Sequence, residues 1–600
     1  METHDGGDSA SSRARLEDAA QFVSAGDSQR GLFLKHPWSI GGGGASELKE
    51  QLESGAAARL DTCADSIGIT AFTLEDDIFV LPAVCAYRKW MAASDLREMV
   101  AGDELRDWQQ PKCDSVVFPY TADFEPAEDD PNSPALRYLW MARTCLANNK
   151  MFAGVTKVQS GLRWYEYGRL TSSKLRTPLS ITFAEIATHN HFVLDRGGKV
   201  FKQTAPVIKL AADATEDQHL ALLGLLNSST ACFWMKQVSH QKQMTGGDGV
   251  RIESRSKVPY AFSGTRLGEM PIPAGWAEGA LRERLLHLTR EMDQRAAGLN
   301  ELTPRAMLGR CELTAAAIRT NSEVCERERN RVRSEMILLQ EEIDFTVYAM
   351  WGFVREDLLA DDWRAEGVVL DAGDRPFDIL RGANEDGFPV PNGVPETWPV
   401  PLRQRWEARM AAIQGSPELR LIEDPHYKRR WKGRQGLFNH SAGSDDVSVA
   451  LQEWLLHRLE SYFDFDGRMQ PGDADQRPSA SLADIGLHSL ARLASVAGSD
   501  AEFLEVATVY RDDPAFDVLA LVTELVLPES VPLLPVLRYK ESGLRKRAEW
   551  EQTWELQRRE DEAVSGQRSA VSGQRSAVSN QRSAVSGQQS AISRQRIARS

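Results

Sequence analysis

The sequence predicts a multidomain α+β protein. We expect a mixed α/β domain, a long helical pair, a mostly helical C-terminal region and a disordered tail. Three observations predict this class. Six hundred residues are too many for a single hydrophobic core. Short apolar segments between turn residues flank one strongly apolar helix, expected at 217–235. Apolar residues recur at near-heptad spacing within 276–352, as in two packed helices.

Composition divides the chain into seven segments. Within these segments, a helix should begin near Ser46, directly after a glycine run. TLEDDIFVLP and SVVFPY are expected to be short strands. Asp513 is expected to cap a late helix. The segments are a disordered N-terminus (1–30), a mixed α/β linker region (31–150), a mixed α/β domain (151–275), an antiparallel helical pair (276–352), an irregular Trp-, Pro- and Gly-rich region (353–445), a helical domain (446–562) and a disordered heptapeptide-repeat tail (563–600).

Charge is distributed unevenly along the chain. The net charge is −15, which argues against indiscriminate coating of nucleic acid. Residues 151–275, however, contain 15 Lys and Arg against 9 Asp and Glu. A basic segment in an acidic chain indicates a confined nucleic-acid footprint, with a chance fluctuation as the alternative.

The polar, glycine-rich loop after the 217–235 stretch is the best candidate for that footprint. Arg and Lys can bind phosphate oxygens or guanine edges, and Gln can bridge an adenine. The alternative is a solvated basic loop, and Phe233 and Trp234 are expected to be core residues. The candidate DNA contacts are Lys236, Gln237, His240, Gln241, Lys242, Arg251, Arg255, Lys257 and Arg266.

No motif predicts catalytic, cofactor-binding or metal-binding residues in this chain. The glycine run 41–44 lacks the preceding apolar strand of a cofactor loop and is interpreted as a hinge. His189 and His191 could be paired metal ligands, but the sequence places no third ligand nearby, so we expect no metal. Seven scattered cysteines predict reduced thiols in a cytoplasm, and no run is apolar enough for a membrane helix.

Several long strings give the chain a family resemblance. They include GLFLKHPWSIGGGGASELKE, RTPLSITFAEIATHNHFVLDRGGKVF, ALLGLLNSSTACFWMKQVSH, LQEEIDFTVYAMWGF, HYKRRW and LRYKESGLRKRAEWEQTWELQRREDE. Over roughly residues 30–562 the chain resembles the C-terminal part of the PglX adenine-specific DNA methyltransferases of phage-growth-limitation (BREX type 2) defence systems. It is more broadly similar to type IIG restriction–modification methyltransferases.

The resemblance implies a function and a cofactor. It makes 151–275 a target-recognition domain that binds double-stranded DNA, with 31–150 as its beginning. The complete family enzyme uses S-adenosylmethionine to methylate adenine at N6. This chain departs from the family because it has no glycine motif for that cofactor and no N-P-P-Y/F motif for the adenine. We therefore expect a catalytically incomplete recognition and scaffold part.

Such a part would act beside a separate catalytic polypeptide and other defence-system components. The chain itself is expected to carry no cofactor and to make no membrane contact. The alternatives are a non-enzymatic interaction component of a defence complex, which would dock partners through 446–562, and a decayed gene fragment.

Overall fold

The computed structural model describes most of the chain and divides it into two compact units. Unit 1 is Met1–Phe72, Val80–Phe118 and Arg169–Leu527, and unit 2 is Thr73–Phe79, Pro119–Gly168 and Pro528–Ser600. The seven boundaries drawn from composition stay predictions, and the predicted disordered N-terminus and nearly all of the tail lie outside the described residues. The structure describes residues 43–83, 86, 91–109, 114–140, 142–151, 154–242, 258–276, 278–360, 362–382, 389–429, 447–462, 489–529, 552–560 and 562–563.

Unit 1 contains several small sheets. Two have four strands, in the orders β10-β8-β12-β2 and β11-β5-β6-β4, and one has the order β13-β14-β9. Two-stranded pairs join β1 to β15 and β3 to β7. The strands are β1 (Ala58–Arg59), β2 (Ser66–Gly68), β3 (Ala71–Phe72), β4 (Val80–Leu81), β5 (Leu96–Val100), β6 (Ser115–Val117), β7 (Arg169–Leu170), β8 (Ser180–Phe183), β9 (Ile186–Ala187), β10 (Phe192–Asp195), β11 (Lys199–Phe201), β12 (Val207–Lys209), β13 (His240–Gln241), β14 (Tyr260–Ala261) and β15 (Pro271–Ile272).

Helices contain more of the described residues than strands do, so the predicted α+β class is confirmed. Short 3₁₀ turns also occur in unit 1 at η2 (Ala93–Asp95), η5 (Ala274–Trp276) and η6 (Glu356–Leu358). The helices wholly or mainly in unit 1 are α2 (Ala45–Ser54), α3 (Leu60–Cys63), α8 (Ser172–Leu175), α9 (Glu216–Leu226), α10 (Ser229–Val238), α11 (Gly264–Gly268), α12 (Ala280–Glu301), α13 (Pro304–Leu308), α14 (Ala315–Met350), α15 (Pro376–Arg381), α16 (Val400–Gly415), α17 (Pro417–Ile422), α18 (Val447–Ser461), α19 (Leu490–Ala497), α20 (Ala501–Arg511) and α21 (Val518–Glu529).

The apolar stretch 217–235 is two helices, not the single helix expected. A new helix starts after Asn227 because the Ser228 side chain accepts a hydrogen bond from the Ala231 N–H and caps α10. The backbone N–H of Asn227 still donates to the Leu223 carbonyl, and its side chain exchanges hydrogen bonds with the backbone of Phe192 at the start of β10, at 2.8 and 3.1 Å. As expected, Phe233 and Trp234 lie in the core. The side chain of Asn227, between α9 and α10, therefore joins both helices to the sheet β10-β8-β12-β2.

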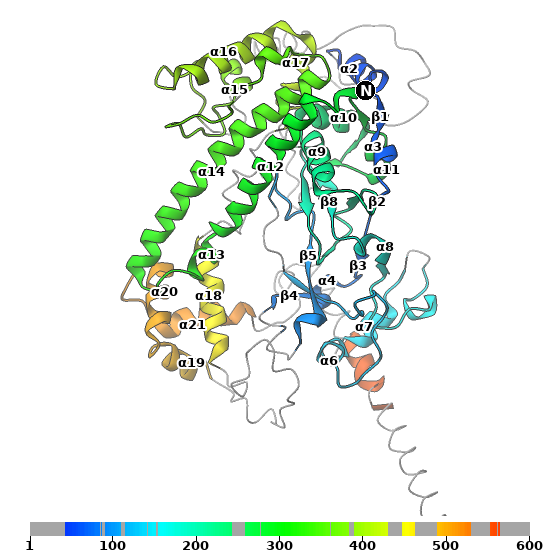
Figure 1. Cartoon of the computed structure of the whole chain (residues 1–600). Coiled ribbons are helices and arrows are strands. Elements are labelled where there is room, and N and C mark those ends of the chain that lie inside the picture. Colours follow the sequence, from blue (N-terminus) through cyan, green and yellow to red (C-terminus); the bar gives the residue numbers. More distant parts are fainter. Residues whose placement is uncertain are drawn as a thin grey trace, which may run out of the picture. The chain divides into compact units, whose positions relative to one another are not determined.

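The predicted helical pair is present as α12 and α14, which lie side by side in Figure 1. The two helices are antiparallel, because Arg284 near the start of α12 pairs with Glu342 and Arg295 near its end pairs with Glu335. Apolar residues of both helices lie in the same core as α9 and the strands β8, β10 and β12. The helical pair therefore packs in one core with α9 and with the sheet β10-β8-β12-β2, to which the α9–α10 junction is bonded through Asn227.

The Trp-, Pro- and Gly-rich region, expected to be irregular, contains α15, α16 and α17. Each of these helices has a proline in its first turn, where the missing N–H would have had no helical partner. Two smaller expectations also change. Asp76–Phe79 is a helical turn (α4), and only Val80–Leu81 of that segment is a strand. Asp517, not Asp513, accepts hydrogen bonds from the first backbone N–H groups of α21.

The helices α18, α19, α20 and α21 form a second apolar cluster in unit 1, to which α13 and the start of α14 contribute. Among the helices in the described part of the chain, none is long and apolar enough to cross a membrane.

Unit 2 is assembled from separated stretches of sequence. Its helices are α4 (Asp76–Phe79), α6 (Pro134–Trp140) and α7 (Arg143–Asn148), with a 3₁₀ turn η3 (Val158–Ser160) and a helical segment at 552–560. The late segment binds the early ones through Gln557, whose Nε2 donates to the Trp140 carbonyl at 2.7 Å. A second bond, from the Thr144 hydroxyl to Glu560 at 2.7 Å, joins the late segment to α7.

Because α9 packs closely on α12, a side chain at Gly224 of α9 should destabilise the protein. A Cβ at this position would lie 2.2 Å from the Thr289 hydroxyl and 2.9 Å from a Leu285 methyl group. We expect Gly224→Ala to lower the free energy of unfolding by about 1–3 kcal/mol, as overpacked cores do. Urea unfolding measures this. Gly298→Ala on α12 is the control, because a Cβ there meets nothing within 4 Å and should stabilise by about 0.5–1 kcal/mol. Equal effects of the two substitutions would contradict this packing.

Candidate nucleic-acid interface

The structure describes six of the nine residues predicted to contact DNA, and places three of them together on one exposed strand edge. His240 and Gln241 form β13, the edge of the three-stranded sheet, and Lys242 follows them. All three are exposed. Arg251, Arg255 and Lys257 lie outside the described residues. The contacts of this set with DNA stay a prediction.

The other three described candidates are engaged within the protein. Lys236 is buried at the end of α10, where its Nζ donates to the His426 carbonyl at 2.7 Å and lies 5.7 Å from the centre of the Tyr260 ring. Gln237 is also buried. Arg266 forms an ion pair with Glu269 at 3.2 Å on α11. In this structure Lys236 therefore holds the strand pair in place from inside.

The base of the candidate loop is fixed by Tyr260 on the neighbouring strand β14. The Gln241 amide donates to the Tyr260 hydroxyl at 2.9 Å, and this hydroxyl lies 3.2 Å from Nε2 of His426. The backbone N–H of Lys242 donates to the Pro259 carbonyl at 2.8 Å. The described residues on either side of 243–257 are thus joined to each other and to the segment containing His426.

That segment, 424–429, is anchored by two fully buried cations. The Lys428 ammonium lies 2.7 Å from Glu423 and 3.0 Å from Asp344. The Arg429 guanidinium donates to Gln340 at 2.8 Å. Burial opposes the charge of Lys428, but the surrounding carboxylates raise the pKa of its ammonium above the usual value. A buried charge of this kind is stable only when such partners surround it.

Asp344 of α14 is the centre of this buried network. Its carboxylate accepts hydrogen bonds from the backbone N–H and the hydroxyl of Ser229, at 2.7 and 2.8 Å. Ser229 is the first residue of α10, so the negative charge lies at the positive end of the helix dipole. The same carboxylate faces Lys428 and, at 3.5 Å, Arg375. Asp344 therefore joins α10 to the segment 424–429.

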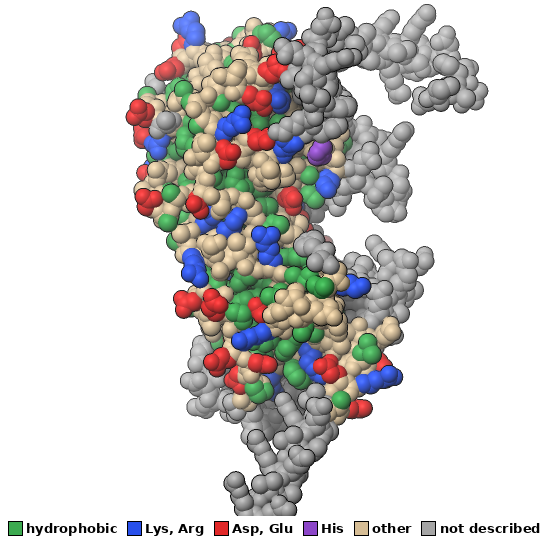
Figure 2. Space-filling view, turned by 90° about the vertical axis from the view of Figure 1, so that its right-hand side faces the viewer, with side chains coloured by type: hydrophobic (Ala, Val, Ile, Leu, Met, Phe, Trp, Pro, Cys, Tyr) green, Lys and Arg blue, Asp and Glu red, His purple; other side chains and the backbone are tan. Residues whose placement is uncertain are grey.

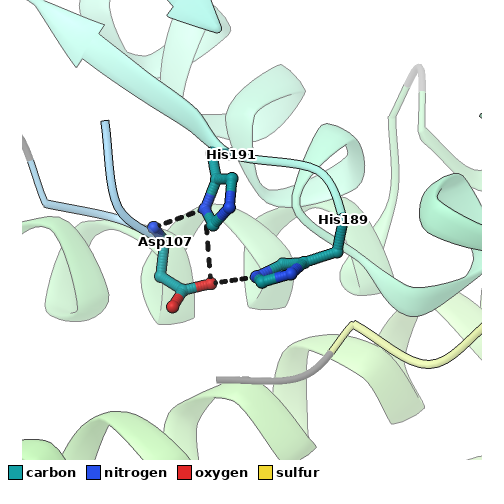
Figure 3. A group of neighbouring side chains, drawn as sticks. All are labelled: Asp107, His189 and His191. Atoms are coloured by element: carbon teal, nitrogen blue, oxygen red, sulfur yellow. Dashed lines mark hydrogen bonds and ion pairs between the residues drawn. The ribbon is translucent and has the colours of Figure 1, made fainter. Parts of the chain in front are cut away.

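A second cluster, made by Asp107, His189 and His191, adjoins this network (Figure 3). Asp107 Oδ1 lies 2.8 Å from His189 Nε2 and 3.2 Å from Arg429 Nη2, and all of these side chains are buried. The backbone N–H of Asp107 donates to Nδ1 of His191 at 2.7 Å. Burial, with His189 beside it, lowers the pKa of His191 well below its usual value, so this ring is neutral and can accept that bond.

These three residues have the ligand types of a metal site, and their candidate ligand atoms lie within 4.8 Å of one another. The fold thus supplies Asp107 as the third group that the sequence neighbourhood of the histidines lacks. Hydrogen bonds, however, already use Nδ1 of His191, Nε2 of His189 and Oδ1 of Asp107, although Nε2 of His191 has no partner, and the Arg429 guanidinium faces the same carboxylate oxygen. A cation would face this fixed positive charge, so the cluster is better suited to fastening the start of β10 to Arg429.

Two segments of the sequence, one acidic and one basic, contain the charged residues of this network, and helical periodicity alone does not connect them. The run Gln340, Glu341, Glu342 and Asp344 interrupts an apolar stretch of α14, and heptad spacing puts such residues on a solvated face. All four are fully buried instead. A cation-rich string, HYKRRW, occurs in a segment with few other signals. A sequence analysis that matched the acidic residues of α14 with the cations of HYKRRW would have predicted a buried network of charges.

Charges on the surface are mixed. On the face shown in Figure 2, Lys and Arg side chains alternate with Asp and Glu among the described residues. On that face the described residues therefore form no broad basic patch.

Comparison with known proteins gives three similarities. A protein-family profile described as a domain of unknown function (DUF7008) matches residues 336–579. The adenine-specific methyltransferase PglX of Streptomyces coelicolor is 35% identical over an alignment of 567 residues, which covers 91% of this chain and 44% of the relative. The solved structure of the type IIL restriction-modification enzyme MmeI in complex with DNA is 13% identical, covers 51% of this chain and 35% of that chain, and has a TM-score of 0.29, a likeness too small to carry an argument.

The chain spans less than half of the length of its PglX relative, so the activity of that whole protein does not transfer to it directly. The similarity nevertheless extends over nearly the whole of this chain, including the α9–α10 junction and the α14 network. The resemblance stated from the sequence is confirmed: the chain is related to the adenine-specific methyltransferase PglX.

Proposed function

We propose that the chain is the DNA-recognition and scaffold part of a site-specific DNA adenine N6-methyltransferase of a phage-defence (BREX) system. The similarity to PglX over 91% of the chain carries this proposal. The exposed strand edge at His240–Lys242, which leads into a loop with three further basic residues, supports DNA as the partner. Unit 1 would present segment 243–257, and β14 and segment 424–429 would hold the residues that flank it.

Methyl transfer would need residues from elsewhere, because the sequence contains neither an N-P-P-Y/F motif nor a glycine motif after an apolar strand. The described glycines of the 41–44 run do not fit a cofactor cradle. Gly43 and Gly44 adopt left-handed conformations before α2, and a Cβ on either would touch the Leu421 side chain at 3.5–3.8 Å. We therefore propose that residues outside this sequence hold S-adenosylmethionine and supply catalysis.

Competition binding tests the recognition role. The purified chain is titrated into labelled duplex DNA, with unlabelled duplex, single-stranded DNA or heparin as competitors. The proposal predicts that duplex DNA competes best, because the loop would bind base edges and phosphates in register. Binding that heparin removes as well as duplex DNA does, or no binding, would contradict it.

A further inference from the structure

We propose that Gln241 reads an adenine in the major groove, and that Tyr260 and His426 orient its amide for this contact. The inference rests on the proposed function, because it names the base that the recognition part would contact. It depends on a chain of hydrogen bonds that runs from the exposed amide of Gln241 through the Tyr260 hydroxyl to His426.

The Gln241 amide is exposed on the edge strand and has a chemical match in adenine. Its bond to the Tyr260 hydroxyl uses one of the two amide hydrogens. An adenine presents the N7 acceptor and the N6 amino donor in the major groove, and a glutamine pairs with both through one N–H and its carbonyl oxygen. Gln241 can keep its bond to Tyr260 while it makes this bidentate contact.

The direction of the hydrogen bonds fixes which end of the amide faces outward. A Tyr260 hydroxyl that accepts from Gln241 has its own hydrogen available for Nε2 of His426, 3.2 Å away. His426 is held in turn, because its backbone N–H donates to Asp424 at 2.8 Å and its carbonyl accepts from Lys236 at 2.7 Å. Without this anchor the amide could turn over and exchange its donor and acceptor.

The anchor also reduces the cost of binding. A free glutamine side chain loses rotational freedom when it contacts a base, whereas one already fixed by Tyr260 loses less. Segment 424–429, with its buried Lys428 and Arg429, supplies the rigidity. Tyr260 and His426 are therefore positioning residues, which act on DNA only through Gln241.

Selection from a random duplex library tests the base contact. Duplexes that bind the wild-type chain are sequenced, and affinities are measured for the preferred duplex and for its single-base-pair variants. We expect Gln241→Ala to lose about 5- to 150-fold of discrimination at one A·T pair, as the loss of a bidentate pair does. Replacement of that adenine by 7-deazaadenine, which lacks N7, should weaken the wild type and not Gln241→Ala. Gln414→Ala, at an exposed glutamine of α16, is the matched control.

A double-substitution cycle tests the positioning role. Tyr260→Phe removes only the hydroxyl, so we expect it to reduce discrimination at the same A·T pair. In the Gln241→Ala background it should change nothing further. A merely structural role for Tyr260 would instead lower binding equally in both backgrounds.

The outcomes separate this inference from the function beneath it. If the wild type selects a sequence and Gln241→Ala keeps full discrimination at every position, the inference is overturned and the recognition role stands. If the wild type binds DNA without any sequence preference, or not at all, both are overturned.

Discussion

Asp344→Ala should destabilise unit 1 by about 3–5 kcal/mol, because it removes one partner from a buried network of charges. Lys428 and Arg375 would lose a carboxylate at 3.0 and 3.5 Å while remaining fully buried. The backbone N–H of Ser229 would also lose its acceptor at the start of α10. Asp344→Asn should cost a comparable amount, since an amide of the same shape cannot balance the two cations.

Hydrogen exchange of the α10 backbone, together with urea unfolding, measures this loss. Asp357→Ala is the control, because Asp357 is exposed and pairs on the surface with the exposed Arg355. Removing such a surface pair should cost about 1 kcal/mol or less. A cost for Asp344→Ala as small as that of the control would show that the buried network does not hold α10.

Neutralising Arg251, Arg255 and Lys257 to glutamine together should weaken DNA binding and flatten its salt dependence. Each lost phosphate contact removes about 0.9 from the slope of log affinity against log salt, so three contacts should lower its magnitude by about 2–3. The loss should be similar for all duplex sequences, because phosphate contacts carry no sequence information. Fluorescence anisotropy over a salt series measures both quantities.

A triple variant of equal charge change separates this local effect from the net charge of the protein. Arg319, Arg355 and Arg364 are exposed and ion-paired on other parts of unit 1. Their replacement by glutamine should leave the salt slope nearly unchanged. Equal slopes for the wild type and for the Arg251, Arg255 and Lys257 variant would show that the loop is not the DNA surface.

Local sequence patterns predicted the parts of the fold whose cause is local. Leu285, Leu288 and Met292 recur at helical spacing on α12, and the matching residues of α14 do the same, so the antiparallel pair was predictable. The break at Asn227–Ser228 was missed because the apolar pattern resumes soon after it, although four polar residues at 227–230 interrupt the pattern and Ser228 is a strong capping residue. The helices of the proline-rich region were missed because prolines in a first turn resemble those of loops.

The buried network could not be predicted from local patterns. Asp344 is buried because Lys428, 84 positions later, reaches it. Asp107 completes the histidine cluster from 82 positions before His189. Nor could the sequence separate the candidate DNA contacts. Gln241 and Lys236 are near neighbours in a polar stretch, and only the fold shows that one is exposed and the other bonded inside the protein.

The most direct test of the recognition role is binding of duplex DNA by the purified chain over a salt series, with tritiated S-adenosylmethionine present. Our account predicts binding that weakens steeply with salt and no transfer of label to the DNA. Methyl transfer by the chain alone would contradict the proposal that catalysis needs residues outside this sequence. The absence of any salt-sensitive binding would contradict the recognition role itself.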